Sequence, residues 1–157
     1  MTIALLGFTT LHAQGFGIGV SGGYLSELDG IGGTADLIYE LDEKWGVSTS
    51  FTFAIKDDTG VRAKWIVIDV NARYIVYDEF YLLAGGEYLD ISLKQLGLGG
   101  GNPVGGEQFS DASEYGANAG AGYKYNLVDN VNVFAEVKYA FVDKGYVHAK
   151  LGLRFDF

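Results

Sequence analysis

The sequence predicts an all-β fold, an antiparallel up-and-down barrel of eight strands that occupies a single domain. Apolar and polar residues alternate with a period of two in eight separate runs of the 157-residue chain, the pattern of half-buried strands. Tight turns and a more variable set of connections alternate between the runs, as in a meander. No run approaches the roughly 20 apolar residues that a membrane-crossing helix needs.

The first four strands are expected at residues 16–24, 31–40, 45–56 and 61–76. The face opposite the apolar one is small or polar in each strand. In the first strand it is Gly17, Gly19, Ser21 and Gly23, and in the fourth strand it includes Asp69, Asn71 and Arg73. The apolar face is clearest in the third strand, with Trp45, Val47, Thr49, Phe51, Phe53 and Ile55.

The last four strands are expected at residues 80–91, 115–125, 131–139 and 147–157. The sixth strand alternates most regularly, with Tyr115, Ala117, Ala119, Ala121 and Tyr123 on one face. Tight turns are expected at 41–44, 77–79 and 128–130, and the other connections at 26–30, 57–60, 92–114 and 143–145. The connection at 92–114 is the long one, with 23 residues and the only proline, Pro103.

Two features indicate that the apolar face points outward to lipid rather than inward. The polar face is rich in glycine and serine, which would leave room inside a narrow barrel for long charged side chains. Aromatic residues of the apolar face gather near the strand ends, as in the two interfacial girdles of membrane barrels. A soluble barrel with an apolar cavity is the alternative. Six large apolar residues depart from the pattern and are expected to face inward: Ile38, Trp65, Val67, Tyr81, Leu83 and Phe134.

Residues 1–14 carry no charged side chain and read as the end of a secretory signal peptide, with Ala13 at the expected cleavage position. The barrel is therefore expected at residues 15–157. The chain ends on Phe157, in the apolar phase of the last strand.

The segments YGANAGAGYKYNL (115–127), VNVFAEVKYAF (131–141) and LGLRFDF (151–157) resemble a known family. This is the porin-family outer-membrane β-barrel domain of Bacteroidota, similar in architecture to the OmpA and OmpX barrels of Gram-negative bacteria. The resemblance implies a bacterial outer-membrane protein with both termini and the tight turns in the periplasm. It also implies that Phe157 acts as the signal for the barrel-assembly machinery. Three of the four expected outer loops are very short, unlike those of the adhesin members.

Charged residues in the inward register form the main candidate site. The lumen network is expected to comprise Arg73, Glu87, Glu136, Lys138, Lys150 and Arg154, joined by Asp36, Glu40, Asp69, Lys124 and Asp156. Charges buried in a lumen must be paired, and Glu136 is expected to pair with Lys150 or Arg154. The network is interpreted as a structural plug. The alternative is a gate in a narrow, low-conductance pore for ions or small solutes.

Catalysis and cofactor binding are not expected. The stretch 17–22 matches the glycine pattern of dinucleotide sites but lies inside a strand rather than before a helix. A lipid-modifying enzyme would need His148 next to a nucleophile such as Ser92, Ser110 or Ser113. The sequence has no nucleophile motif, and nothing in it would hold these serines in place. A single histidine in residues 15–157 and no cysteine argue against a metal site, and a net charge of −9 argues against nucleic acid.

A strip of small residues on the lipid face of the fifth and sixth strands could dock another outer-membrane protein. It consists of Ala84, Gly86, Ala117, Ala119 and Ala121. Small side chains allow two membrane segments to approach closely. The other expected partners are outer-membrane lipid and lipopolysaccharide. The sequence thus predicts a structural or interaction protein, stand-alone or an accessory subunit.

Overall fold

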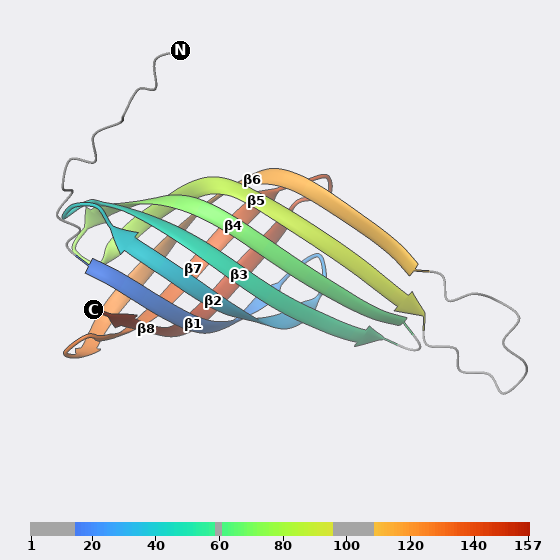
Figure 1. The fold of residues 1–157 in the computed structure, drawn as a ribbon, viewed down its shortest axis with the longest axis horizontal. Coiled ribbons are helices and arrows are strands. Elements are labelled where there is room, and N and C mark those ends of the chain that lie inside the picture. Colours follow the sequence, from blue (N-terminus) through green and yellow to red (C-terminus); the bar gives the residue numbers. More distant parts are fainter. Residues whose placement is uncertain (1–14, 59–60, 96–108) are drawn as a thin grey trace, which may run out of the picture.

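The computed structural model describes residues 15–58, 61–95 and 109–157, which form one closed barrel of eight antiparallel strands (Figure 1). The strands are β1 (Gly15–Leu25), β2 (Gly30–Glu40), β3 (Trp45–Asp58), β4 (Val61–Tyr77), β5 (Phe80–Gln95), β6 (Phe109–Val128), β7 (Val131–Phe141) and β8 (Tyr146–Asp156). Each strand pairs with its neighbours in sequence, and β1 pairs with β8 to close the sheet. The predicted fold class is confirmed. The expected signal peptide at 1–14 lies outside the described residues.

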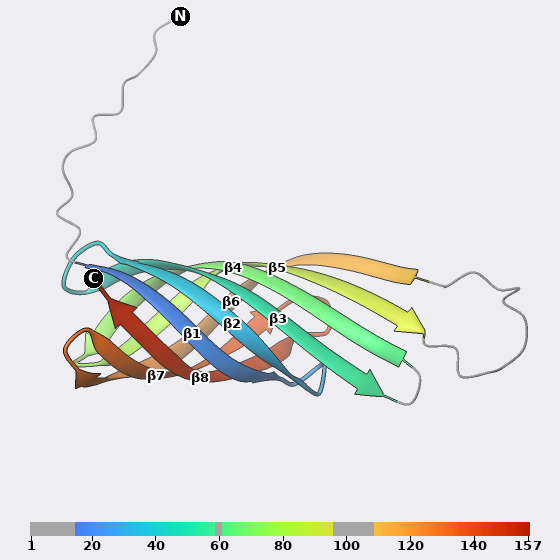
Figure 2. The ribbon, with the colours of Figure 1, turned by 60° about the horizontal axis from the view of Figure 1, so that its bottom comes forward.

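The two ends of the barrel are built differently. β1 starts and β8 finishes at the same end, together with the turns at 41–44, 78–79 and 129–130 (Figure 2). We call this the terminal end and the opposite one the loop end. At the terminal end, the Asp42 carboxylate accepts hydrogen bonds of 2.7 Å from the backbone N–H groups of Lys44 and Trp45. These bonds stabilise the carboxylate and hold the pKa of Asp42 below its usual value.

The prediction of a 23-residue loop at 92–114 is wrong. β5 and β6 continue to pair beyond the predicted strand ends, from Leu89 opposite Glu114 to Lys94 opposite Phe109. The sequence hid this extension because the alternation reverses along β5, with Asp90 and Ser92 in the outward phase and Ile91 and Leu93 in the inward phase. A strand that rises above the lipid needs no apolar outer face, so the pattern of apolar residues outside and small or polar residues inside does not continue.

The outer surface of the barrel is apolar, and the direction of each face is as the sequence predicted. Val70 on β4 is 55% exposed and Leu151 on β8 is 62% exposed, whereas the inward Val67 is fully buried. An exposed apolar surface around a whole barrel is unfavourable in water and is what a membrane barrel turns to lipid. The soluble alternative therefore fails. The described residues also contain no helix that is long and apolar enough to span a membrane.

Aromatic side chains form a ring at each end of this surface. The ring of Trp45 packs against that of Tyr74 at the terminal end, with centroids 4.8 Å apart, and the rings of Tyr88 and Tyr115 lie 4.9 Å apart at the loop end. On β1 the rings of Phe16 and Tyr24 are separated by eight residues, which is roughly 20 Å along the axis of a tilted strand. This separation is close to the thickness of the apolar band of outer-membrane barrels, about 25 Å.

Candidate functional site in the barrel lumen

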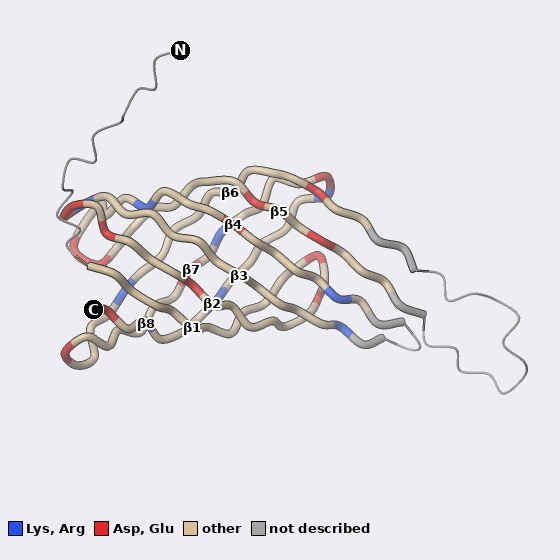
Figure 3. Tube along the Cα trace, in the orientation of Figure 1, with Lys and Arg blue, Asp and Glu red and all other residues tan. Residues whose placement is uncertain are grey.

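The lumen is built from every second residue of each strand, and its side chains form two layers. The layer nearer the terminal end is charged, and the layer nearer the loop end is apolar. Figure 3 shows charged positions along the strands as well as at the turns. All six residues of the predicted lumen network are buried: Arg73, Glu87, Glu136, Lys138, Lys150 and Arg154.

Lys138 on β7 reaches across the lumen to carboxylates on two other strands. Its Nζ lies 2.5 Å from Asp69 Oδ2 on β4 and 2.9 Å from Glu87 Oε2 on β5. The Lys138 and Asp69 side chains are each 2% exposed, so water screens these pairs little. Asn71 Nδ2 donates a further hydrogen bond to Asp69. The ion pairs therefore join distant parts of the sheet.

Lys150 on β8 makes the second buried centre. Its Nζ lies 2.7 Å from Asp36 Oδ1 on β2 and 3.0 Å from Glu136 Oε1 on β7. Between β8 and β2, the β1 strand carries Gly19, where an added Cβ would stand 3.1 Å from the Asp36 Cβ. Glycine at this position leaves room for the pair to meet, as expected from the small residues of the inward face.

Glu136 is held by three groups from three strands. Besides Lys150, the Tyr81 hydroxyl donates a hydrogen bond of 3.0 Å to its Oε2, and Arg73 Nη2 lies 3.8 Å from the same oxygen. The Arg73 guanidinium also lies 4.0 Å from the centre of the Tyr81 ring. Glu136 and Lys150 thus pair in the first of the two ways considered from the sequence.

Arg154 does not pair with Glu136. It contacts Glu40 and Asp156 at the terminal end, and Lys124 lies 3.9 Å from Glu40 Oε1. The reason is register, because Arg154 lies opposite Asn132 on β7 while Glu136 lies opposite Lys150. This rim cluster borders a small cavity of about 100 Å³ between the turns.

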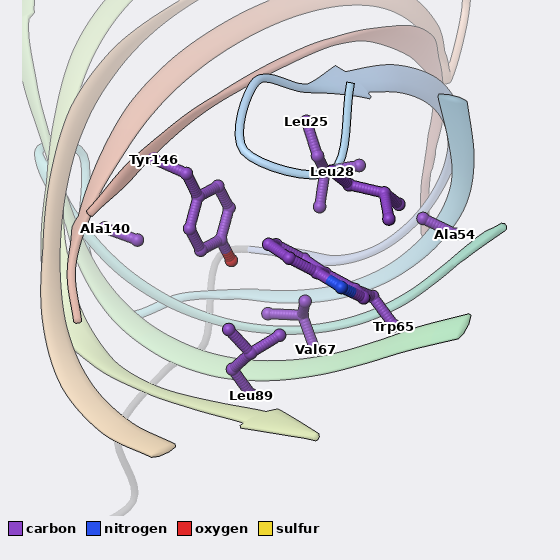
Figure 4. Close-up of a cluster of buried hydrophobic side chains, with 8 residues drawn as sticks. All are labelled: Leu25, Leu28, Ala54, Trp65, Val67, Leu89, Ala140 and Tyr146. Atoms are coloured by element: carbon purple, nitrogen blue, oxygen red, sulfur yellow. The ribbon is translucent and has the colours of Figure 1, made fainter. Parts of the chain in front are cut away.

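The apolar layer is a cluster of eight buried residues, drawn in Figure 4: Leu25, Leu28, Ala54, Trp65, Val67, Leu89, Ala140 and Tyr146. The rings of Trp65 and Tyr146 meet edge to face across the lumen with centroids 5.4 Å apart. The Tyr146 hydroxyl donates to Glu87 and so connects the two layers. The sequence pattern placed Ala54, Trp65 and Val67 on the inward face but did not single out the other five. Leu25, Ala140 and Tyr146 lie near strand ends, Leu28 lies in a turn, and Leu89 lies where the sequence predicted β5 to end.

The six inward apolar residues that broke the pattern are all buried in the lumen. Trp65 and Val67 belong to the apolar layer. Ile38 and Tyr81 line the cavity at the terminal end, and the Phe134 ring lies 5.7 Å from Lys150 Nζ. Five of these residues lie in continuous pairing, whereas Tyr81 lies opposite Ile75, next to the register shift between Ile75 and Tyr77 on β4.

His148 is buried in the lumen, and neither ring nitrogen has a hydrogen-bond partner among the described residues. Ser92 and Ser113 lie on the outward phase of β5 and β6, away from the histidine. The Ser110 side chain lies outside the described residues. In the described part of the chain, no group of three or more His, Asp or Glu side chains could hold a metal ion.

The residues of the predicted docking strip are contiguous on the outer surface. Ala84 lies opposite Ala119, Gly86 opposite Ala117, and Ala121 opposite Leu82. At the seam of the barrel, the Phe157 backbone N–H donates to Phe16 O at 2.7 Å, and Phe157 is 77% exposed.

No protein-family model and no curated protein sequence matches this chain. Solved structures of membrane barrels do match it. The N-terminal β-barrel domain of OprF from Pseudomonas aeruginosa matches with a TM-score of 0.65 and 20% identity, covering 92% of this chain and 98% of that one.

The attachment invasion locus protein Ail of Yersinia pestis matches with a TM-score of 0.60 and 19% identity, over 91% of this chain and 97% of Ail. A major outer membrane protein from Thermus thermophilus matches with a TM-score of 0.76 and 14% identity, over 91% and 98% of the two chains. The predicted eight-stranded outer-membrane β-barrel is therefore confirmed. Its assignment to the Bacteroidota type stays a prediction.

Proposed function

We propose that this outer-membrane barrel is a structural or interaction protein whose lumen is closed to ions and solutes. It works alone or as an accessory subunit, with its termini and tight turns in the periplasm. The observation that supports this function best is the pair of stacked layers in the lumen. The buried ion pairs of Lys138 and Lys150 lie directly below the packed cluster around Trp65 and Tyr146.

Each layer opposes permeation for its own physical reason. An ion that enters the apolar layer loses its hydration and finds no replacement ligand. An ion in the charged layer must separate pairs that are already close and buried, such as Lys150 with Asp36 at 2.7 Å. A barrel of eight strands is in any case only wide enough for its own side chains.

The test is single-channel recording of the purified barrel in planar lipid bilayers. We expect no discrete conductance steps from the natural chain. A Trp65→Ala, Tyr146→Ala double variant removes both rings of the apolar layer and is expected to show transient openings. Flotation with liposomes confirms that both proteins insert. Stable, salt-dependent steps from the natural chain would instead establish the narrow pore and refute the closed lumen.

A second proposal concerns assembly with another outer-membrane protein through the strip on β5 and β6. Supporting it, Ala84 and Ala119 form a cross-strand pair next to Gly86 and Ala117, where an added Cβ at Gly86 would meet nothing within 4 Å. The strip is thus shallow and open, and the backbone of a partner could approach it closely.

Native gels of detergent-extracted outer membranes test this second proposal. A species larger than the monomer is expected, and Ala119→Trp should dissociate it. Leu151→Trp, on the outer face of β8, is the matched control and should leave it intact. A large species that survives Ala119→Trp, or a monomer alone, would rule out docking at the strip.

The remaining expectations about partners are proposals of the same kind. Phe157 is proposed to be read by the barrel-assembly machinery, for which its exposed ring at the seam is suitable. Lipid and lipopolysaccharide surround the apolar belt. Neither catalysis nor nucleic-acid binding is proposed, and hydrolysis of lipids that depends on His148 would contradict this.

A further inference from the structure

The loop end of the barrel is uneven in height. β3, β4, β5 and β6 continue beyond the turns at 26–29 and 142–145, which connect the shorter strands on the other side (Figures 1 and 2). Among the side chains that the structure describes, Ala63, Ile91, Leu93 and Ala112 give the inner face of the tall side apolar surface, next to Lys56 opposite Ala63. Leu93 is 39% exposed although it points inward.

A cavity of about 350 Å³ lies against this inner face. Trp65, Leu89 and Tyr146 line its deep part, and Leu28 and Val142 from the two turns close its sides. Sites for small molecules in proteins begin at about this volume and are mostly apolar. The cavity differs from the closed lumen below it, because it opens at the loop end and its deepest residues are the top of the apolar layer.

The deep part of the cavity has nothing to offer an ion or a strongly polar group. Trp65 is 5% exposed and Leu89 is 1% exposed, so each presents only a small apolar edge, and Ile91 and Leu93 above them add apolar surface. The Tyr146 hydroxyl is already engaged as a donor to Glu87. Water in such a place lacks partners and is readily displaced by an apolar molecule.

The charged side chains that line the cavity are already engaged, and each of its two lysines has an acidic neighbour. Lys56 Nζ is 3.1 Å from Asp29, and Lys144 Nζ is 3.5 Å from Glu27. Glu114 accepts a hydrogen bond from the backbone N–H of Asp143. A ligand with a full charge would have to compete with these pairs, whereas a neutral polar group can hydrogen-bond beside them.

We propose that this cavity binds a small uncharged amphiphile, with its apolar body against Trp65 and Leu89 and its neutral polar group at the rim. The class of ligand is that of medium-chain aliphatic alcohols. This binding goes beyond the structural role of the barrel and does not require the lumen to conduct. A docked peptide is a poorer fit, because its backbone N–H and C=O groups would find no partners in the deep part.

The two tryptophans of the chain supply the test, because only one of them lines the cavity. Trp45→Phe leaves Trp65 as the single reporter, and Trp65→Phe leaves Trp45, which lies on the lipid surface at the terminal end. Both variants are reconstituted in phosphatidylcholine nanodiscs and titrated with 11-bromoundecanol, whose bromine quenches tryptophan on contact. We expect saturable quenching of Trp65 and only gradual, unsaturable quenching of Trp45 as the alcohol enters the lipid.

Filling the cavity provides the specificity control. Ala112 lines the cavity and is exposed, so Ala112→Phe in the Trp45→Phe background should fold and should abolish the saturable phase. Ala63→Phe is the second filling variant, and far-UV circular dichroism checks the fold of each. The anion 11-bromoundecanoate is expected to quench Trp65 at higher concentration than the alcohol.

Three results would overturn the proposal. The first is quenching of Trp65 that rises in the same unsaturable way as that of Trp45, because the alcohol then only partitions into the lipid. The second is absence of Trp65 quenching, which is the result if residues 96–108 of the chain fill the cavity. The third is saturable quenching that persists in both filled variants, because the alcohol then binds elsewhere.

Discussion

At the scale of single residues, the lumen depends on a few lysines that each hold two carboxylates. Lys138 is the most enclosed of them, 2% exposed and within 2.9 Å of both Asp69 and Glu87. Removing one partner from a buried ion pair leaves a charge that neither water nor protein stabilises. Replacing such a lysine therefore destabilises the barrel mainly because its carboxylate partners stay buried without a cation.

Lys138→Met keeps the length of the side chain and removes its charge. We expect the free energy of unfolding to fall by about 3–5 kcal/mol, since Asp69 and Glu87 would remain buried without a cation. Urea unfolding of the barrel in lipid vesicles measures the change. Lys124→Met is the matched control, because Lys124 is 21% exposed and its nearest carboxylate oxygens are 3.9 and 4.0 Å away. Its effect should stay below about 1 kcal/mol, and equal effects of the two variants would contradict the account.

The sequence predicted which charged residues face the lumen but not which of them meet. The face on which a side chain lies follows from the period of two within one strand. Lys138, for example, points inward because its neighbours Val137 and Tyr139 point outward. The contact of Lys138 with Asp69 spans the lumen from β7 to β4, so it depends on the curvature of the sheet and the stagger of eight strands. Arg154 illustrates the same limit, since a shift of four residues along β8 decides between Glu136 and the terminal end.

At the scale of elements, strand pairing places strict limits on small residues that look alike in the sequence. Gly85 and Gly86 are adjacent on β5 and point to opposite faces. An added Cβ at Gly85 would lie 1.9 Å from the Val70 carbonyl oxygen, whereas at Gly86 it would meet nothing within 4 Å. The first glycine is required for β4 and β5 to pack, and the second only shapes the lipid surface.

Gly85→Ala should therefore destabilise the barrel by roughly 1–3 kcal/mol, because the two strands must shift to make room. Gly86→Ala adds the same methyl group one residue away and should change stability by less than about 0.5 kcal/mol. Thermal unfolding of both variants in the same lipid gives the comparison. Similar losses of stability in the two variants would mean that the described register of β5 is wrong.

Strand ends show where sequence patterning stops being informative. The ends of β7 and β8 were predicted within a few residues because lipid requires an apolar face along their length. The pairing of Ser92 with Asp111 was missed because lipid imposes no such requirement above the belt. Leu28 joins the lumen from a turn, where side chains follow no period at all.

At the scale of the whole molecule, two independent requirements determine which residues lie on the outside and on the inside of the barrel. Lipid requires an apolar outer surface, and the narrow interior requires small residues wherever a long side chain crosses it. A net charge of −9 is compatible with this because charges lie at the turns and in paired positions inside (Figure 3). We propose that the same interior closes the lumen, which is the central claim of the proposed function.

Nuclear magnetic resonance of methyl groups in lipid nanodiscs tests that claim most directly, because it needs no substitution. Val67 and Leu83, which are buried and lie away from the cavity at the loop end, report on the lumen, and Val70 and Leu82 report on the outer surface. We predict nuclear Overhauser effects from lipid chains to Val70 and Leu82, and none from water to Val67 or Leu83. Water contacts at Val67 and Leu83 would mean a hydrated, open lumen and would contradict the account.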